Sequence, residues 1–148
     1  MNLPKRTEKW MKHFEGTMGT IERDSQGPAG RGTFPKEVYD SAPRDIVKLL
    51  NINKLDSVAD IGGATGDFSK HIIKNCNPDY LCMFDANYLA VNYFQKWIDS
   101  NNLQNIDSKL CILPDFKSDR VFDKIILGSV LIYLSSLDDV EELSLIHI

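Results

Sequence analysis

The chain has 148 residues, which is enough for one compact domain and too few for two of ordinary size. Its net charge of −4 argues against a basic surface for nucleic acid or anionic lipid, and no apolar run reaches the roughly 20 residues of a membrane span. With 43% hydrophobic and 26% charged residues, the composition is that of an ordinary globular domain.

The cysteines and the N-terminus bear on the compartment. Cys76, Cys82 and Cys111 are an odd number with no C-x-x-C spacing, which favours free thiols over a disulfide framework or a zinc site. The N-terminus has no hydrophobic segment of the secretory kind. We therefore expect a cytoplasmic protein without a structural metal.

The first part of the chain carries little periodicity. Residues 1–40 include a stretch rich in glycine, threonine, serine and proline, and we interpret them as a lid or loop segment. Ser41 is expected to cap a helix with Pro43 in its first turn. The apolar face predicted for this helix consists of Ile46, Val47, Leu49 and Leu50.

Short apolar runs then alternate with amphipathic patterns. The runs predict strands over residues 57–61, 80–85, 109–113 and 122–128. The helices between and after them are marked by Phe68, Ile72 and Ile73, by Leu89, Tyr93 and Trp97, and by a start at Ser135 or Ser136. Lys70 and Lys74 are expected to solvate the outer side of the first of these helices, and Tyr93 and Trp97 to face the core. This alternation predicts an α/β fold with a parallel sheet flanked by helices.

The first predicted strand leads into "DIGGATG" at residues 60–66, where three glycines and an alanine occupy five positions. A tight turn needs one or two glycines, so the surplus indicates a ligand lying against bare backbone at a helix N-terminus. The dinucleotide fingerprint G-x-G-x-x-G does not fit, because counting from Gly62 puts Asp67 at the third position, where its carboxylate would repel pyrophosphate. The P-loop lysine is also missing. The loop is therefore expected to bind a cationic ligand without phosphates.

The same stretch resembles motif I of class I S-adenosylmethionine-dependent methyltransferases, an acid followed by G-x-G-x-G, and the similarity extends from about residue 40 to 142. The resemblance implies a Rossmann-like sheet and S-adenosyl-L-methionine as cofactor. It implies that Asp60 lies near the cofactor's amino group, directly or through water, and that Asp85 accepts both ribose hydroxyls. The loop residues expected to lie against the cofactor are Gly62, Gly63, Ala64 and Gly66. An alanine is tolerable there if the backbone of Ala64 keeps a negative φ.

Two later segments are weaker candidates. Asp115 and Phe116, in "LPDF", resemble the loop after the third strand that contacts adenine in this family, although Asp115 is equally consistent with a plain turn residue. In "GSVLIYL" at 128–134, Ser129 and Tyr133 either line the reacting centre or complete a helix start. This segment has no proline, which excludes the Pro-Pro motif of enzymes that methylate base amines. The sequence identifies no catalytic residue. For His13, a solvated side chain is the favoured interpretation, and a general base on a lid is the weaker one.

The end of the chain suggests that the family's seven-stranded sheet is incomplete at the C-terminus. The last six residues, "LSLIHI", can be encoded by CTG TCT CTT ATA CAC ATC, a transposon end sequence used in preparing sequencing libraries. We therefore interpret residues 143–148 as a non-native tail and residues 41–142 as a partial cofactor-binding domain.

These observations predict a methyltransferase that acts on a small-molecule, glycan or lipid-precursor acceptor, with nucleic acid disfavoured. Two alternatives stay open. One is an NAD(P)-dependent Rossmann oxidoreductase, which Asp67 disfavours. The other is a non-catalytic cofactor-binding domain, which the sequence does not exclude.

Overall fold

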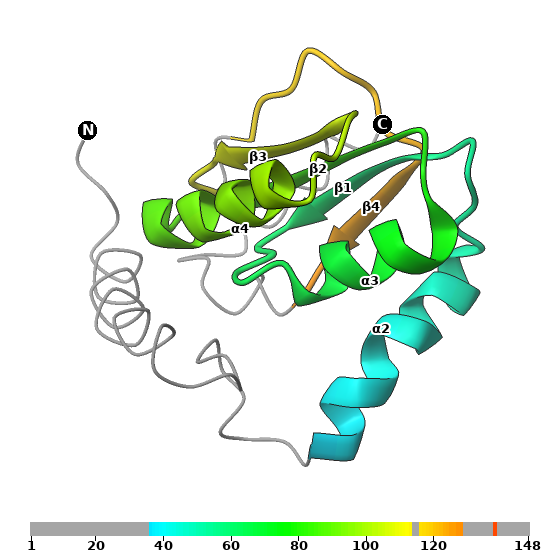
Figure 1. Ribbon diagram of the computed structural model, residues 1–148. Coiled ribbons are helices and arrows are strands. Elements are labelled where there is room, and N and C mark those ends of the chain that lie inside the picture. Colours follow the sequence, from blue (N-terminus) through cyan, green and yellow to red (C-terminus); the bar gives the residue numbers. More distant parts are fainter. Residues whose placement is uncertain (1–35, 114–115, 129–137, 139–148) are drawn as a thin grey trace.

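The computed structural model describes residues 36–113, 116–128 and 138, with side chains from residue 41 onwards. Four strands form one sheet in the order β3-β2-β1-β4, and every neighbouring pair is parallel (Figure 1). The strands are β1 (Ser57–Ile61), β2 (Tyr80–Asp85), β3 (Ile106–Leu110) and β4 (Lys124–Leu127). The predicted parallel α/β fold is confirmed, and so are the bounds of the first two strands.

Three helices lie on one face of this sheet: α2 (Lys36–Leu50), α3 (Asp67–Cys76) and α4 (Tyr88–Ser100) (Figure 1). Helix α2 begins earlier than predicted, so Ser41 does not cap it and Pro43 lies inside it. Proline lacks the N–H for one backbone hydrogen bond, but a helix of 15 residues retains the others. Leu49 was also wrongly placed on the apolar face, because it is 82% exposed, while Ile46, Val47 and Leu50 pack against the core.

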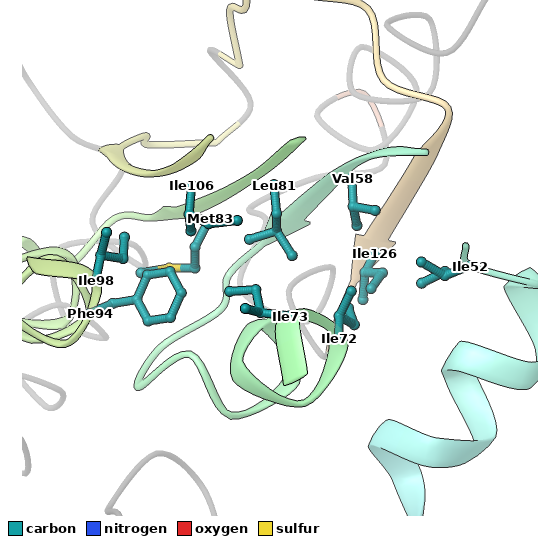
Figure 2. Packing of buried hydrophobic residues seen from close by; sticks show 10 residues of the cluster. All are labelled: Ile52, Val58, Ile72, Ile73, Leu81, Met83, Phe94, Ile98, Ile106 and Ile126. Atoms are coloured by element: carbon teal, nitrogen blue, oxygen red, sulfur yellow. The ribbon is translucent and has the colours of Figure 1, made fainter. Parts of the chain in front are cut away.

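The main core lies between the sheet and these helices. Its ten buried residues come from β1 to β4, α3, α4 and the segment that follows α2 (Figure 2): Ile52, Val58, Ile72, Ile73, Leu81, Met83, Phe94, Ile98, Ile106 and Ile126. On α4 the buried face consists of Ala90, Phe94 and Ile98, whereas Tyr93 is 39% exposed and Trp97 is only partly buried. The predicted core position was therefore wrong for Tyr93, whereas Trp97 packs against the edge of the core. The buried stripe lies one residue further along the chain, at Phe94 and Ile98. The polar ring atoms of Tyr93 and Trp97 favour a position near solvent.

The opposite face of the sheet carries a second, largely aromatic cluster. Segments between β3 and β4 pack on it, with Phe116 meeting Phe84 edge-on at 4.9 Å between ring centroids and Phe122 meeting it at 6.0 Å. The third strand ends at Leu110 rather than continuing to Leu113, because Cys111 and Leu113 belong to this cluster. The predicted strand at 109–113 was thus three residues too late. The apolar residues Cys111 and Leu113 belong to a loop that packs on the sheet, not to the strand.

Three further findings concern the described part of the chain. None of its helices is long and apolar enough to cross a membrane. All three cysteines are free thiols, with Cys82 buried and the other two half-buried. Among the same residues, no group of three or more His, Cys, Asp or Glu side chains is placed to hold a metal ion.

Candidate cofactor site

The glycine-rich loop, residues 62–66, joins the carboxyl end of β1 to the start of α3. Gly62 and Gly66 have φ values of 78° and 75°, a left-handed conformation that glycine adopts without steric cost. The amides of Gly62 and Gly63 donate to the carbonyl oxygen of Phe84 at 2.7 and 3.2 Å. These bonds hold the loop against the end of β2.

Ala64 has the same left-handed backbone, with φ of 49°. The condition named for tolerating an alanine here, a negative φ, is therefore not met. The Ala64 amide donates to Asp85 Oδ2 at 2.8 Å, and this charge-assisted bond offsets the strain of a Cβ in that conformation. The loop is thus tied to the end of β2 at both Phe84 and Asp85.

Packing accounts for two of the glycines. A Cβ on Gly66 would come within 2.3 Å of Phe94 Cδ2, and one on Gly63 within 2.4 Å of Met83 Cγ. Both positions are closed to larger residues by the core itself. The glycine surplus is therefore weaker evidence for a ligand than the sequence suggested, and the case for one depends on the acids around the loop.

Asp60 lies in β1 and is only 2% exposed. Burial raises the pKa of its carboxyl to about 6, although the hydroxyl of Ser69, which donates to Oδ2 at 2.6 Å, favours the charged form. The nearby charges of Asp85 and Asp67 raise this pKa further. Two acids near the loop therefore act electrostatically on Asp60.

Asp85 is the last residue of β2 and has backbone amides as partners. Its Oδ2 accepts from Ala64, and its Oδ1 accepts from the amide of Asn87 at 2.8 Å. Burial raises the pKa of this carboxyl, and the amides of Asn87 and Ala64 partly offset that rise. Because each carboxylate oxygen has two lone pairs, both can accept one more hydrogen bond from a ligand.

Asn87 is a site residue that the sequence reasoning missed. It caps α4 by accepting from the Leu89 amide at 2.9 Å, and its side chain is 6% exposed. Its Nδ2 is buried and has no hydrogen-bond partner among the described residues. The available signal was an asparagine directly before a helical pattern, two residues after a strand-end acid.

Two residues of α3 were also missed. Ser69, which binds Asp60, is fully buried on the face turned to the sheet. Lys70 was wrongly expected only to solvate the helix, because it is half-buried and its Nζ donates to the carbonyl oxygen of Thr65 at 2.7 Å. Neither contact is visible in the sequence, since both depend on how α3 leaves the loop.

The structure brings Asp60, the loop and Asp85 together at the carboxyl ends of β1 and β2. Phe116 packs against Phe84, the neighbour of Asp85, and its contact with adenine stays a prediction. Asp115 and Ser129 lie outside the described residues, as do Tyr133 and His13.

A hollow of about 420 Å³ lies elsewhere, at the amino ends of β2 and β3. It is lined mainly by polar residues, among them Asn77, Asp79, Asn102 and Asn105. Ligands of parallel α/β sheets bind at the carboxyl ends of the strands, where this chain has the buried Asp60 and the half-buried Asp85. We therefore place the candidate site at the glycine-rich loop.

No protein-family model matches the chain, and no curated protein matches it. Solved structures do match. Phosphoethanolamine N-methyltransferase 1 of Haemonchus contortus, in complex with phosphoethanolamine and S-adenosylhomocysteine, has a TM-score of 0.77 at 17% identity and covers 98% of this chain and 30% of its own. The N-methyltransferase NodS of Bradyrhizobium japonicum WM9, with S-adenosylhomocysteine, has a TM-score of 0.65 at 19% identity over 86% of this chain and 63% of its own.

An S-adenosylmethionine-dependent methyltransferase of Aquifex aeolicus also matches, with a TM-score of 0.61 at 18% identity over 74% of this chain and 60% of its own. The chain thus spans between 30% and 63% of the length of these three proteins. Such similarity establishes the fold, which is that of the class I S-adenosylmethionine-dependent methyltransferases.

Proposed function

We propose that the protein is an S-adenosylmethionine-dependent methyltransferase whose cofactor lies on the glycine-rich loop. The observation that carries this proposal is the convergence of a buried carboxylate, Asp60, and a half-buried one, Asp85, on one bare stretch of backbone. Burial without a cationic partner is costly for a carboxylate. A ligand that brings positive charge and a vicinal diol would offset that cost.

The residues fit the two ends of this cofactor. Asp85 has room on each oxygen for one ribose hydroxyl while it keeps its bonds to Ala64 and Asn87. Asp60 is suited to face the cofactor's ammonium group, directly or through water. The unpaired Nδ2 of Asn87 offers a donor close to the ribose seat. The bound cofactor would supply the electrophilic methyl group, and the protein would supply alignment and exclusion of water.

The competing dinucleotide is disfavoured by Asp67. This residue opens α3, where a pyrophosphate would lie against the helix N-terminus. A carboxylate at that point repels the phosphates, and it adds to the negative potential that Asp60 experiences. The same charge attracts a ligand with a sulfonium and an ammonium.

For the acceptor, we propose a small molecule, a glycan or a lipid precursor. Support comes from the Haemonchus contortus enzyme, which was solved with phosphoethanolamine and matches 98% of this chain. The net charge of −4 also disfavours nucleic acid as the acceptor.

Calorimetric titration with S-adenosylhomocysteine and, separately, with NAD⁺ tests the cofactor. We expect binding of the first, with a higher melting temperature, and none of the second. Binding of NAD⁺ alone would overturn the proposal in favour of an oxidoreductase.

Methyl transfer is tested by incubating the protein with methyl-labelled cofactor and a cell extract. Label in the small-molecule or lipid fraction is expected. Cofactor binding without transfer to any fraction would instead indicate a non-catalytic cofactor-binding domain.

A further inference from the structure

Lys70 occupies an unusual place for a cation. It lies in the first turn of α3, where the helix dipole disfavours positive charge. It is also half-buried, although lysine is seldom withdrawn from solvent without compensating contacts. Its location therefore calls for favourable partners.

Those partners are a carbonyl of the glycine-rich loop and two aromatic rings of α4. The Lys70 Nζ lies 2.7 Å from the carbonyl oxygen of Thr65, which is 5% exposed. It also lies 4.7 Å from the ring centroid of Tyr93 and 5.6 Å from that of Trp97. Both distances are within the range of cation–π attraction. The ammonium thus bridges the loop to α4.

A second contact joins α4 to the same loop. Trp97 stacks on Phe94 with centroids 5.5 Å apart and an interplanar angle of 15°. Phe94 is in turn the residue that a Cβ on Gly66 would strike. The aromatic residues of α4 therefore hold the loop at Gly66 by packing and at Thr65 through Lys70.

We propose that Lys70 is a positioning residue for cofactor binding, fixing the Thr65 peptide so that the loop is set before the cofactor arrives. This inference rests on the proposed function. Thr65 lies between Ala64, whose amide is held by Asp85, and Gly66, which starts α3. If the Thr65 carbonyl were released, the loop would sample other conformations, and binding would have to order it again.

The test compares Lys70→Met with Lys74→Met, which removes the same charge from an exposed position on the same helix. We expect Lys70→Met to weaken S-adenosylhomocysteine binding about tenfold, equivalent to about 1.4 kcal/mol, and to accelerate amide hydrogen exchange at residues 64–66 in the ligand-free protein. Lys74→Met should leave both unchanged. Lys70→Arg should restore most of the affinity, because a guanidinium also donates hydrogen bonds and stacks on aromatic rings.

Each result decides something. Unchanged affinity in Lys70→Met, with wild-type binding intact, would overturn the inference and leave the proposed function standing. Weaker binding without faster exchange in the loop would also overturn it, since Lys70 would then act on the ligand directly. If the wild type binds no S-adenosylhomocysteine, the proposed function fails, while the exchange rates still report whether Lys70 orders the loop.

A second variant guards against a failure of Lys70→Met to fold. Tyr93→Leu removes one ring of the bridge at a position that is 39% exposed, so the core is left intact. We expect it to weaken binding about threefold, with the same acceleration of exchange, because one cation–π contact is worth roughly 0.5–1 kcal/mol. If this variant binds S-adenosylhomocysteine as tightly as the wild type, and its loop amides exchange at the wild-type rate, the proposed role of the rings is contradicted.

Discussion

The ends of β1 and β2 each carry one acid, buried in Asp60 and half-buried in Asp85, and different kinds of partner hold the two. Asp60 has the hydroxyl of a single side chain, Ser69, and lies almost wholly out of solvent. Asp85 accepts from the backbone amides of Ala64 and Asn87, and so ties the loop to the start of α4. Burial makes the charge of both acids costly, but the oxygens of Asp85 also accept from the amides of Ala64 and Asn87, so Asp85 stabilises the loop. Neutralising the two acids should therefore change the free energy of unfolding in opposite directions.

The largest effect is expected from adding a side chain at Gly66, in the loop that follows β1. Gly66→Ala combines a left-handed φ of 75° with a Cβ 2.3 Å from Phe94. We expect the free energy of unfolding to fall by about 3 kcal/mol. Gly128→Ala, at the end of β4, is the control, because nothing lies within 4 Å of its Cβ, and it should cost under about 0.5 kcal/mol. Equal losses in chemical denaturation would contradict the packing account.

Removing the charge of Asp60 comes next. Its folded-state pKa of about 6 lies above the ordinary value of 3.8, so the folded protein binds this proton more tightly than the unfolded chain. The free energy of unfolding should therefore rise as pH falls from about 7 to about 4. Asp60→Asn should remove this component and stabilise the protein at pH 7 by about 2 kcal/mol, while weakening binding of S-adenosylhomocysteine.

Denaturation curves at several pH values, for wild type and Asp60→Asn, measure this effect. Asp85 also has a raised pKa, so the informative quantity is the difference between the two proteins rather than either slope alone. Identical pH dependence in both would show that the charge of Asp60 does not burden the fold.

The matched change at the other strand end should act in the opposite direction. In Asp85→Asn, an amide NH₂ faces one of the two backbone N–H groups that the carboxylate now accepts. We expect a loss of about 1–2 kcal/mol in stability and more than tenfold weaker binding of S-adenosylhomocysteine. Denaturation and calorimetry on the same preparation give both quantities. A stabilised Asp85→Asn would erase the distinction between the two acids.

The smallest expected effect concerns the strain that Asp85 helps to hold. Ala64→Gly relieves a side chain at φ of 49° and should stabilise the protein by about 0.5–1 kcal/mol. Ala90→Gly, in the first turn of α4, should instead destabilise it by about 1 kcal/mol, since glycine disfavours helix. If both variants lost stability alike under thermal denaturation, Ala64 would not be strained.

Sequence reasoning succeeded where a local pattern has one structural solution. Apolar runs that end in an acid located β1 and β2, and parallel strands then required Asp60 and Asp85 to converge. It failed where tertiary contacts choose between near-equal options. On α4, the stripes through Phe94 and through Tyr93 differ by one residue, and only the packing against Gly66 decides between them.

The remaining errors have the same origin. The apolar residues after Leu110 are equally consistent with a strand. They form a loop instead, because they pack on the second face of the sheet. The φ of Ala64 follows from its bond to Asp85, which is 21 residues away in the chain. The sequence around Lys70 is that of any solvated lysine on a helix, because its contact with Tyr93 depends on how α4 packs against α3. Contacts of this kind have no signature in one sequence.

The cofactor site is tested by a crystal structure of the protein with S-adenosylhomocysteine. We expect the ribose hydroxyls within hydrogen-bond distance of the Asp85 carboxylate, and the amino group facing Asp60 across the glycine-rich loop. Ligand density at the hollow near Asn77, or anywhere away from these two acids, would contradict it.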